Sequence, residues 1–266
     1  MSRNESTMLI EFEAPPLPSP RDRWALFVDI DGTLVDFAQR PDDVRIDSGL
    51  ITLLERLEDA LDGALAVLSG RHLADIDRML APLVLPAGAL HGIERRLPNG
   101  DTTVTPAPRA VSEQVRKACL EGIQLLRGVT LESKAGSGFA MHYRSARHHA
   151  AAVHQLVHRI ADESGSQFVV QTGSCVAELI PPGRDKGSAL RSLLDSPPFR
   201  GRRPIVLGDD LTDEHAFIEA SRHEGFGIIV GGRRPTAARF ALESPGHAVD
   251  WLHTLLGVLN DEGAHQ

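Results

Sequence analysis

Three short apolar segments are each followed directly by polar residues, and this feature restricts the fold most. Residues 24–29 read WALFVD, residues 64–68 read ALAVL and residues 204–207 read PIVL. Continuous apolar runs of this length are typical of strands buried on both faces of a parallel sheet. Segment 48–61 places leucines at helical spacing, which predicts a connecting helix. The alternation predicts a doubly wound α/β fold whose site lies at the carboxyl ends of the strands.

Further segments fit the same pattern. The sequence predicts a strand at 225–230 and helices at 72–80, 186–194 and 212–220. The middle of the chain differs, because its predicted strands alternate apolar and polar residues. These strands are expected at 130–134, 138–143, 167–171 and 175–180. Two further helices are expected at 112–126 and 145–163. Four strands and two helices in one block predict an antiparallel sheet backed by helices on one side.

We therefore expect a Rossmann-like parallel-sheet core with a smaller α+β cap domain inserted into it. The predicted core segments are 22–103 and 182–260, the cap is 104–181, and a proline-rich flexible leader occupies 1–21. Prolines and glycines bracket the insert, so hinges are expected near 103–108 and 179–183.

Composition restricts the partners. Acidic residues outnumber basic ones by 36 to 28, giving a net charge of −8, which argues against nucleic acid or an anionic membrane as partner. The sequence has neither an apolar run long enough to cross a bilayer nor a secretory signal pattern, so a cytoplasmic location is expected. Cys119 and Cys175 match no metal-ligand spacing and are expected as free thiols. We expect a monomer, because no apolar stripe indicates a partner chain.

Polar side chains follow the predicted strands or begin a predicted helix. They belong to Asp29, Asp31, Ser69, Arg71, Lys186, Asp209 and Asp213, and Gly70 lies between Ser69 and Arg71. Several carboxylates at one edge of a sheet would repel one another, so the cluster needs a cation. Oxygen-only ligands favour Mg²⁺. Lys186 can neutralise a carboxylate and a phosphoryl group, and Ser69 can donate a hydrogen bond to a phosphoryl oxygen.

Each motif alone is weak: Asp-x-Asp-Gly is common in turns, and Gly-Asp-Asp can be a helix cap. The order Asp-x-Asp-Gly-Thr, Ser-Gly-Arg, Lys, Gly-Asp-Asp-x-x-Asp resembles the haloacid dehalogenase superfamily of phosphohydrolases. The resemblance implies that Asp29 is the nucleophile, Asp31 the general acid and base, and Ser69 and Lys186 phosphate-site residues. It also implies Mg²⁺ held by Asp29, the Asp31 carbonyl and Asp209, with Asp213 in support.

The cap must select the substrate. Glu132 and Lys134 share one face of a predicted strand, and from periodicity alone a solvated ion pair is the more ordinary interpretation. The histidines of segment 145–163 are expected at the surface rather than as ligands.

Three strings of the sequence resemble trehalose-6-phosphate phosphatases specifically. They are His-Gly-x-Glu-Arg-Arg, Glu-x-Lys with His-Tyr-Arg after it, and Val-x-Glu-Leu-x-Pro-x-Gly-x-x-Lys-Gly. This resemblance implies that Glu132, Lys134 and Glu178 bind the distal glucose. Gly70 and Arg71 are also expected to contact the substrate.

The predicted activity is Mg²⁺-dependent hydrolysis of trehalose 6-phosphate to trehalose and phosphate, the last step of trehalose biosynthesis. A phosphatase for sucrose 6-phosphate or mannosyl-3-phosphoglycerate would keep the catalytic residues and differ at the three cap positions. A sugar-phosphate mutase would return the phosphoryl group to another hydroxyl. A non-catalytic module on the same scaffold is disfavoured, because both Asp29 and Lys186 are present.

Overall fold

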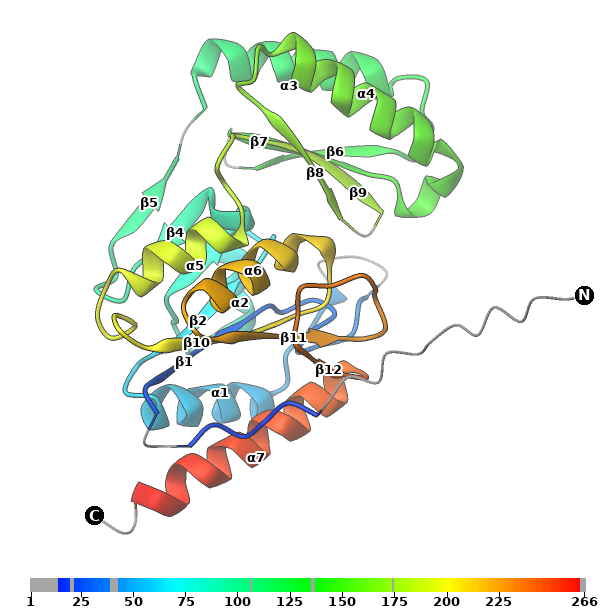
Figure 1. Ribbon diagram of the computed structural model, residues 1–266. Coiled ribbons are helices and arrows are strands. Elements are labelled where there is room, and N and C mark those ends of the chain that lie inside the picture. Colours follow the sequence, from blue (N-terminus) through cyan, green and yellow to red (C-terminus); the bar gives the residue numbers. More distant parts are fainter. Residues whose placement is uncertain are drawn as a thin grey trace, which may run out of the picture.

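The computed structural model describes residues 14–19, 22–38, 43–105, 107–134, 137–173 and 175–263. These residues form an eight-stranded sheet and a separate four-stranded sheet, each packed against helices (Figure 1). We call the eight-stranded sheet with its helices the core, and the four-stranded sheet with its helices the cap. Across the described part of the chain, no helix has the length and apolar character needed to span a bilayer.

The core sheet has the strand order β12-β11-β10-β1-β2-β3-β4-β5. The first six strands in this order are parallel: β12 (Phe240–Leu242), β11 (Phe226–Val230), β10 (Arg203–Gly208), β1 (Trp24–Val28), β2 (Leu65–Leu68) and β3 (Ala87–Ala89). An antiparallel extension follows, made of β4 (Glu94–Arg96) and β5 (Thr102–Val104). Every residue of β1, β2 and β11 is buried, as expected for strands covered on both faces.

Helices cover both faces of the core sheet (Figure 1). They are α1 (Ser48–Ala60) and α7 (Pro245–Gly263) on one face, α5 (Lys186–Leu194) and α6 (Glu214–Arg222) on the other, and α2 (Leu73–Leu80), which follows β2. The N-terminus of α1 is fixed by Asp47, whose side chain accepts a hydrogen bond from the Leu50 N–H. This layering confirms the predicted doubly wound α/β fold.

The cap sheet is antiparallel and has the order β6-β7-β9-β8. Its elements are β6 (Thr130–Lys134), β7 (Gly138–His142), β8 (Val169–Gly173), β9 (Val176–Ile180), α3 (Arg109–Ile123) and α4 (Ala150–Glu163). Both helices lie on the face turned away from the core (Figure 1). Phe139, Val157 and Phe168 belong to a hydrophobic cluster distinct from that of the core. The predicted antiparallel sheet backed by helices is thus observed, while the domain boundaries themselves stay a prediction.

Some details differ from the predictions. The helix expected from 145 begins only at Ala150, because Ala146 has non-helical dihedral angles and a 3-10 turn, Arg144–His149, comes first. The short strands β3, β4, β5 and β12 and the long helix α7 were not predicted. Within the expected leader, Pro15 is buried and its carbonyl accepts a hydrogen bond from the Trp251 indole of α7. Residues 1–13, 20 and 21 lie outside the described residues.

Candidate active site

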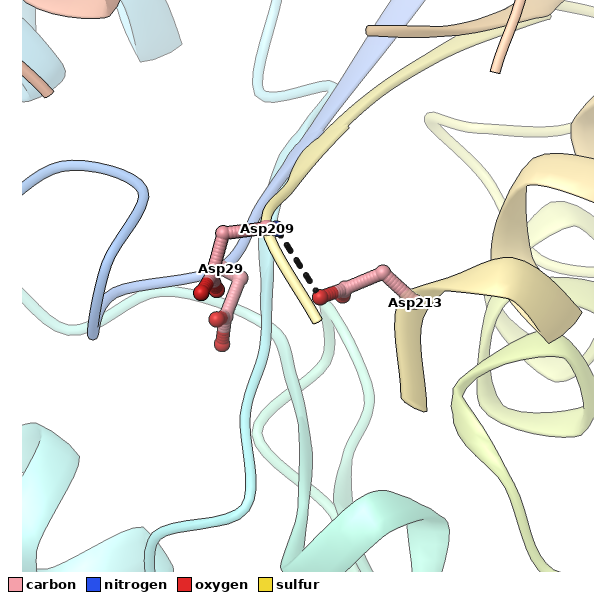
Figure 2. Close-up of side chains that lie close together, drawn as sticks. All are labelled: Asp29, Asp209 and Asp213. Carbon is pink, nitrogen blue, oxygen red and sulfur yellow. Dashed lines mark hydrogen bonds between the residues drawn. The ribbon is translucent and has the colours of Figure 1, made fainter. Parts of the chain in front are cut away.

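Three buried or half-buried carboxylates meet at the carboxyl end of the core sheet. β1 and β10 are adjacent and parallel with Val28 opposite Leu207, so Asp29 and Asp209 leave the sheet side by side. A 3-10 turn, Leu211–Asp213, then turns Asp213 back toward them. One oxygen from each carboxylate lies within 4.8 Å of the others (Figure 2). The three aspartates predicted as carboxylate ligands on different segments are therefore brought together.

Lys186 provides the positive charge of this cluster. Its Nζ lies 3.0 Å from Asp29 Oδ1 and 2.7 Å from Asp213 Oδ1, and the residue is 2% exposed. The other Asp213 oxygen accepts the backbone N–H groups of Asp209 and Asp210, at 3.2 and 3.1 Å. Asp213 therefore holds both the ammonium and the loop that carries Asp209.

The carboxylates are crowded enough to alter their protonation. Burial, repulsion from Asp213 and Asp209, and to a lesser degree Asp31 raise the pKa of Asp29 well above its ordinary value, although Lys186 opposes this. Burial and the Asp213 charge raise the pKa of Asp209 to about 7. Burial would lower the pKa of Lys186, but Asp213 and Asp29 raise it overall. Three carboxylates share one ammonium, so a bound cation would relieve their repulsion, and an all-oxygen donor set fits Mg²⁺.

Asp31 is not in this trio. Its two carboxylate oxygens accept hydrogen bonds from Arg71 Nε and a terminal Arg71 nitrogen, each at 2.6 Å. Gly32 follows Asp31 directly and has a φ of 80°. A Cβ at this position would collide with the Asp209 carboxylate. Glycine thus allows the turn after Asp31 to pass close to the Asp209 carboxylate.

The segment after β2 lies beside Asp31. Ser69 is buried, and its hydroxyl accepts a hydrogen bond from the Arg71 N–H at 3.2 Å. Gly70 presents its carbonyl to the cap, where Lys134 Nζ donates to it at 2.9 Å. We call Ser69–Arg71 the phosphate loop, the role predicted for it.

The predicted sugar-binding residues of the cap also come together. Lys134 Nζ lies 3.0 Å from Glu178 Oε1 and 4.0 Å from Glu132 Oε1. The solvated ion pair considered from periodicity was Glu132–Lys134, but Lys134 is only 4% exposed and lies closer to Glu178, which is 2% exposed. Burial would raise the pKa of Glu178, but the charges and hydrogen bonds of His91 and Lys134 lower it well below the ordinary range.

Predicted site residues from both the core and the cap line one cleft of about 830 Å³. From the core it includes Asp31, Gly70 and Arg71, and from the cap Glu132, Lys134 and Glu178. Asp29, Ser69, Lys186, Asp209 and Asp213 are not among its lining residues. The cleft volume is within the usual range for small-molecule sites.

Two histidines of the cleft received no role from the sequence. His142 Nε2 lies 2.6 Å from Glu132 Oε2, and His91 Nε2 lies 3.0 Å from Glu178 Oε2. His91 begins the string His-Gly-x-Glu-Arg-Arg, but the sequence assigned it no contact with the substrate. The His142 contact follows from the pairing of Thr130 with His142, a register that the sequence does not reveal.

Comparisons with known proteins agree with this architecture. The family model described as trehalose-phosphatase matches residues 27–246. The trehalose-6-phosphate phosphatase of Escherichia coli (strain K12) is 35% identical over 250 residues, which is 94% of this chain and 92% of that protein.

Two solved structures resemble the fold. The C-terminal domain of the C. albicans trehalose-6-phosphate phosphatase matches with a TM-score of 0.77 at 20% identity, over 89% of this chain and 92% of that one. A haloacid dehalogenase-like hydrolase from Bacteroides thetaiotaomicron matches with a TM-score of 0.66 at 15% identity, over 87% of this chain and 99% of that one. At these identities they show the fold alone. The family match and the E. coli relative go further: the chain belongs to the trehalose-phosphatase family.

Proposed function

We propose that this protein hydrolyses trehalose 6-phosphate to trehalose and phosphate. The observation that carries the proposal is the direct contact between Lys134 of the cap and the Gly70 carbonyl of the phosphate loop, at 2.9 Å. It places the Lys134–Glu178 pair, suited to sugar hydroxyls, beside the groups suited to a phosphoryl oxygen. The E. coli relative carries this substrate in its name.

The reaction proposed for this site passes through a phosphorylated aspartate. The Asp29 carboxylate attacks phosphorus in line with the departing sugar oxygen and forms an acyl phosphate. Lys186, within 3.0 Å of that carboxylate, offsets negative charge as the bond forms. Ser69 offers its hydroxyl to a phosphoryl oxygen.

Asp31 is the proposed general acid and base. Because the Asp31 carboxylate is ionised in its pair with Arg71, it must first take up a proton from water. It then donates this proton to the sugar oxygen and later takes one from the water that cleaves the acyl phosphate. Both Asp31 oxygens are engaged by Arg71, so this pair must open first. A phosphate group in the cleft competes for the same guanidinium, because Arg71 also lines the cleft. Substrate binding would thereby free Asp31 for proton transfer.

We propose Mg²⁺ as the cofactor. Asp29, Asp209 and the Asp31 carbonyl would hold it, with Asp213 in support, and the close approach of the three carboxylates supports such a site. When bound, the ion would neutralise charge on the phosphoryl oxygens. The cytoplasmic location, the monomeric state and the division into leader, core and cap remain part of the proposal.

Phosphate release from a panel of sugar phosphates, with and without Mg²⁺, tests the proposal. We expect release from trehalose 6-phosphate only with Mg²⁺, and a fall of at least about a thousandfold in Asp29→Asn, because the nucleophile is removed. The Asp29→Asn protein should keep wild-type circular dichroism. A preference for sucrose 6-phosphate or mannosyl-3-phosphoglycerate would exclude the proposed substrate. Rearranged sugar phosphate without free phosphate would indicate a mutase.

A further inference from the structure

His91 lies where the core meets the cap, and neither the proposed chemistry nor the proposed sugar contacts use it. It lies in a 3-10 turn (Leu90–Gly92) directly after β3 and is 7% exposed. Its φ of 55° is in the left-handed region, which bulky residues seldom adopt. The His91 N–H donates to the Ser69 carbonyl at 3.0 Å, which ties this turn to the phosphate loop.

The His91 ring contacts the phosphate loop on one side and the cap on the other. A Cβ added at Gly70 would lie 2.7 Å from Nε2, so the glycine makes room for the ring. Nε2 also lies 3.0 Å from Glu178 Oε2. The other Glu178 oxygen lies 3.0 Å from Lys134 Nζ, which returns to the Gly70 carbonyl. Gly70, His91, Glu178 and Lys134 therefore form a closed ring of contacts that crosses between core and cap twice.

The position of the hydrogen on the His91 imidazole explains why this side chain bonds to Glu178. An ionised carboxylate only accepts hydrogen bonds, so Nε2 must carry the hydrogen. Nδ1 is buried and has no hydrogen-bond partner among the described residues. When the imidazole is neutral, the tautomer with its hydrogen on Nε2 leaves only a lone pair unmatched at Nδ1, whereas a hydrogen on Nδ1 would be an unmatched buried donor. Within the described part of the chain, the polar contact of the His91 side chain is thus made to Glu178 of the cap.

We propose that His91 is a positioning residue for sugar recognition. It fixes the Glu178 carboxylate between its own Nε2 and Lys134, and it thereby sets the position of the cap against the phosphate loop. This inference rests on the proposed function, in which Glu178 contacts the sugar. Because His91 contacts neither Asp29 nor Lys186 in the contacts described above, it should affect the choice of substrate and leave the chemical step unchanged.

The test compares His91→Leu with His91→Gln. Leucine fills much of the ring volume without a hydrogen bond, whereas glutamine carries an N–H donor at a similar reach. Both variants place a side chain at the same left-handed backbone position, so the conformational cost is similar in the two. In His91→Leu we expect the KM for trehalose 6-phosphate to rise about tenfold or more, the size expected for one hydrogen bond to a buried charge. Its kcat/KM for p-nitrophenyl phosphate should stay within about threefold, and His91→Gln should recover most of the lost affinity.

Equal losses on both substrates, or equal defects in the two variants, would overturn the inference. If the wild type prefers another sugar phosphate, the proposed substrate fails, and the same comparison is made with the preferred one. Hydrogen exchange without substrate gives a readout independent of activity. Residues 69–71 and 176–180 should exchange faster in His91→Leu than in wild type or His91→Gln. Unchanged exchange in His91→Leu would likewise contradict the proposed role.

Discussion

At the scale of single residues, the crowded carboxylates should make the metal-free protein sensitive to pH. The pKa of Asp209 is raised to about 7 in the folded chain, from an ordinary value of 3.8. Between these values the folded state holds a proton that the unfolded state has lost, so stability falls as pH rises. In EDTA we therefore expect the Tm to drop between about pH 5 and about pH 8.

Asp209→Asn should make that drop shallower, since asparagine does not titrate, and Mg²⁺ should do the same in the wild type by stabilising the ionised form. Some slope should remain in the variant, because the pKa of Asp29 is also raised. Calorimetric melts at about pH 5 and about pH 8, with EDTA or with Mg²⁺, measure the fall in Tm. An Asp209→Asn protein with the wild-type slope would show that this carboxyl is not the titrating group.

The same residues show how far the sequence could predict the site. Asp29 and Asp209 directly follow buried strands, and Lys186 begins a helix, so their convergence follows from the parallel topology. The contact of His91 with Glu178 joins segments 87 positions apart and depends on how the cap packs on the core. No periodicity within either segment specifies such a pairing.

At the scale of elements, the start of α5 positions the ammonium of Lys186. Asp185 accepts the Ser188 N–H at 2.6 Å, and the Ser188 hydroxyl accepts the Asp185 N–H at 3.1 Å, which forms a capping box one residue before Lys186. Asp185→Ala should cost about 1 kcal/mol of unfolding free energy. It should also lower kcat several-fold, because the helix end that carries Lys186 becomes less ordered.

Asp47→Ala is the matched control. The Asp47 side chain likewise accepts the N–H three residues on, that of Leu50, but α1 carries none of the proposed site residues. This variant should lose a similar free energy of unfolding, measured in urea, and keep the wild-type kcat. Equal kcat in both variants would show that the cap of α5 contributes to stability alone.

The helices and strands also differ in how well the sequence predicts them. The bounds of α5 and β6 match their predicted ranges. In α5, buried apolar residues recur at helical spacing, at Ala189, Leu190, Leu193 and Leu194. The short β3 reads Ala-Gly-Ala and has no β-branched residue, and its neighbours β4 and β5 are largely polar or exposed. Such strands form because adjacent strands offer them hydrogen bonds, which local preference does not reveal. In contrast, α7 has apolar residues at helical spacing and could have been predicted.

At the scale of the whole molecule, few polar contacts connect the cap to the phosphate loop. Lys134 donates to Gly70, and Glu178 pairs with His91. The linkers between core and cap contain Pro108, Pro181, Pro182 and Gly183, the last with φ of 70°. Since β5 continues to Val104 and β9 to Ile180, bending is expected in the residues just after each of these strands. Release of the contacts at the phosphate loop should therefore let the cap rotate as one body.

Lys134→Met tests this rotation directly. The substitution removes the ammonium from the buried Glu178 carboxylate and leaves it only the contact with His91. A buried charge that has lost its ion-pair partner is more costly than a hydrated one. Rotation of the cap hydrates Glu178, so the radius of gyration from X-ray scattering should increase, and proteolysis near residues 105–108 and 181–184 should accelerate. Lys117→Met is the control, because Lys117 is exposed on α3 and its 3.9 Å pair with Glu121 contributes little. If the Lys134→Met and Lys117→Met scattering curves coincide, then packing between cap and core, rather than this ion pair, keeps the cleft closed.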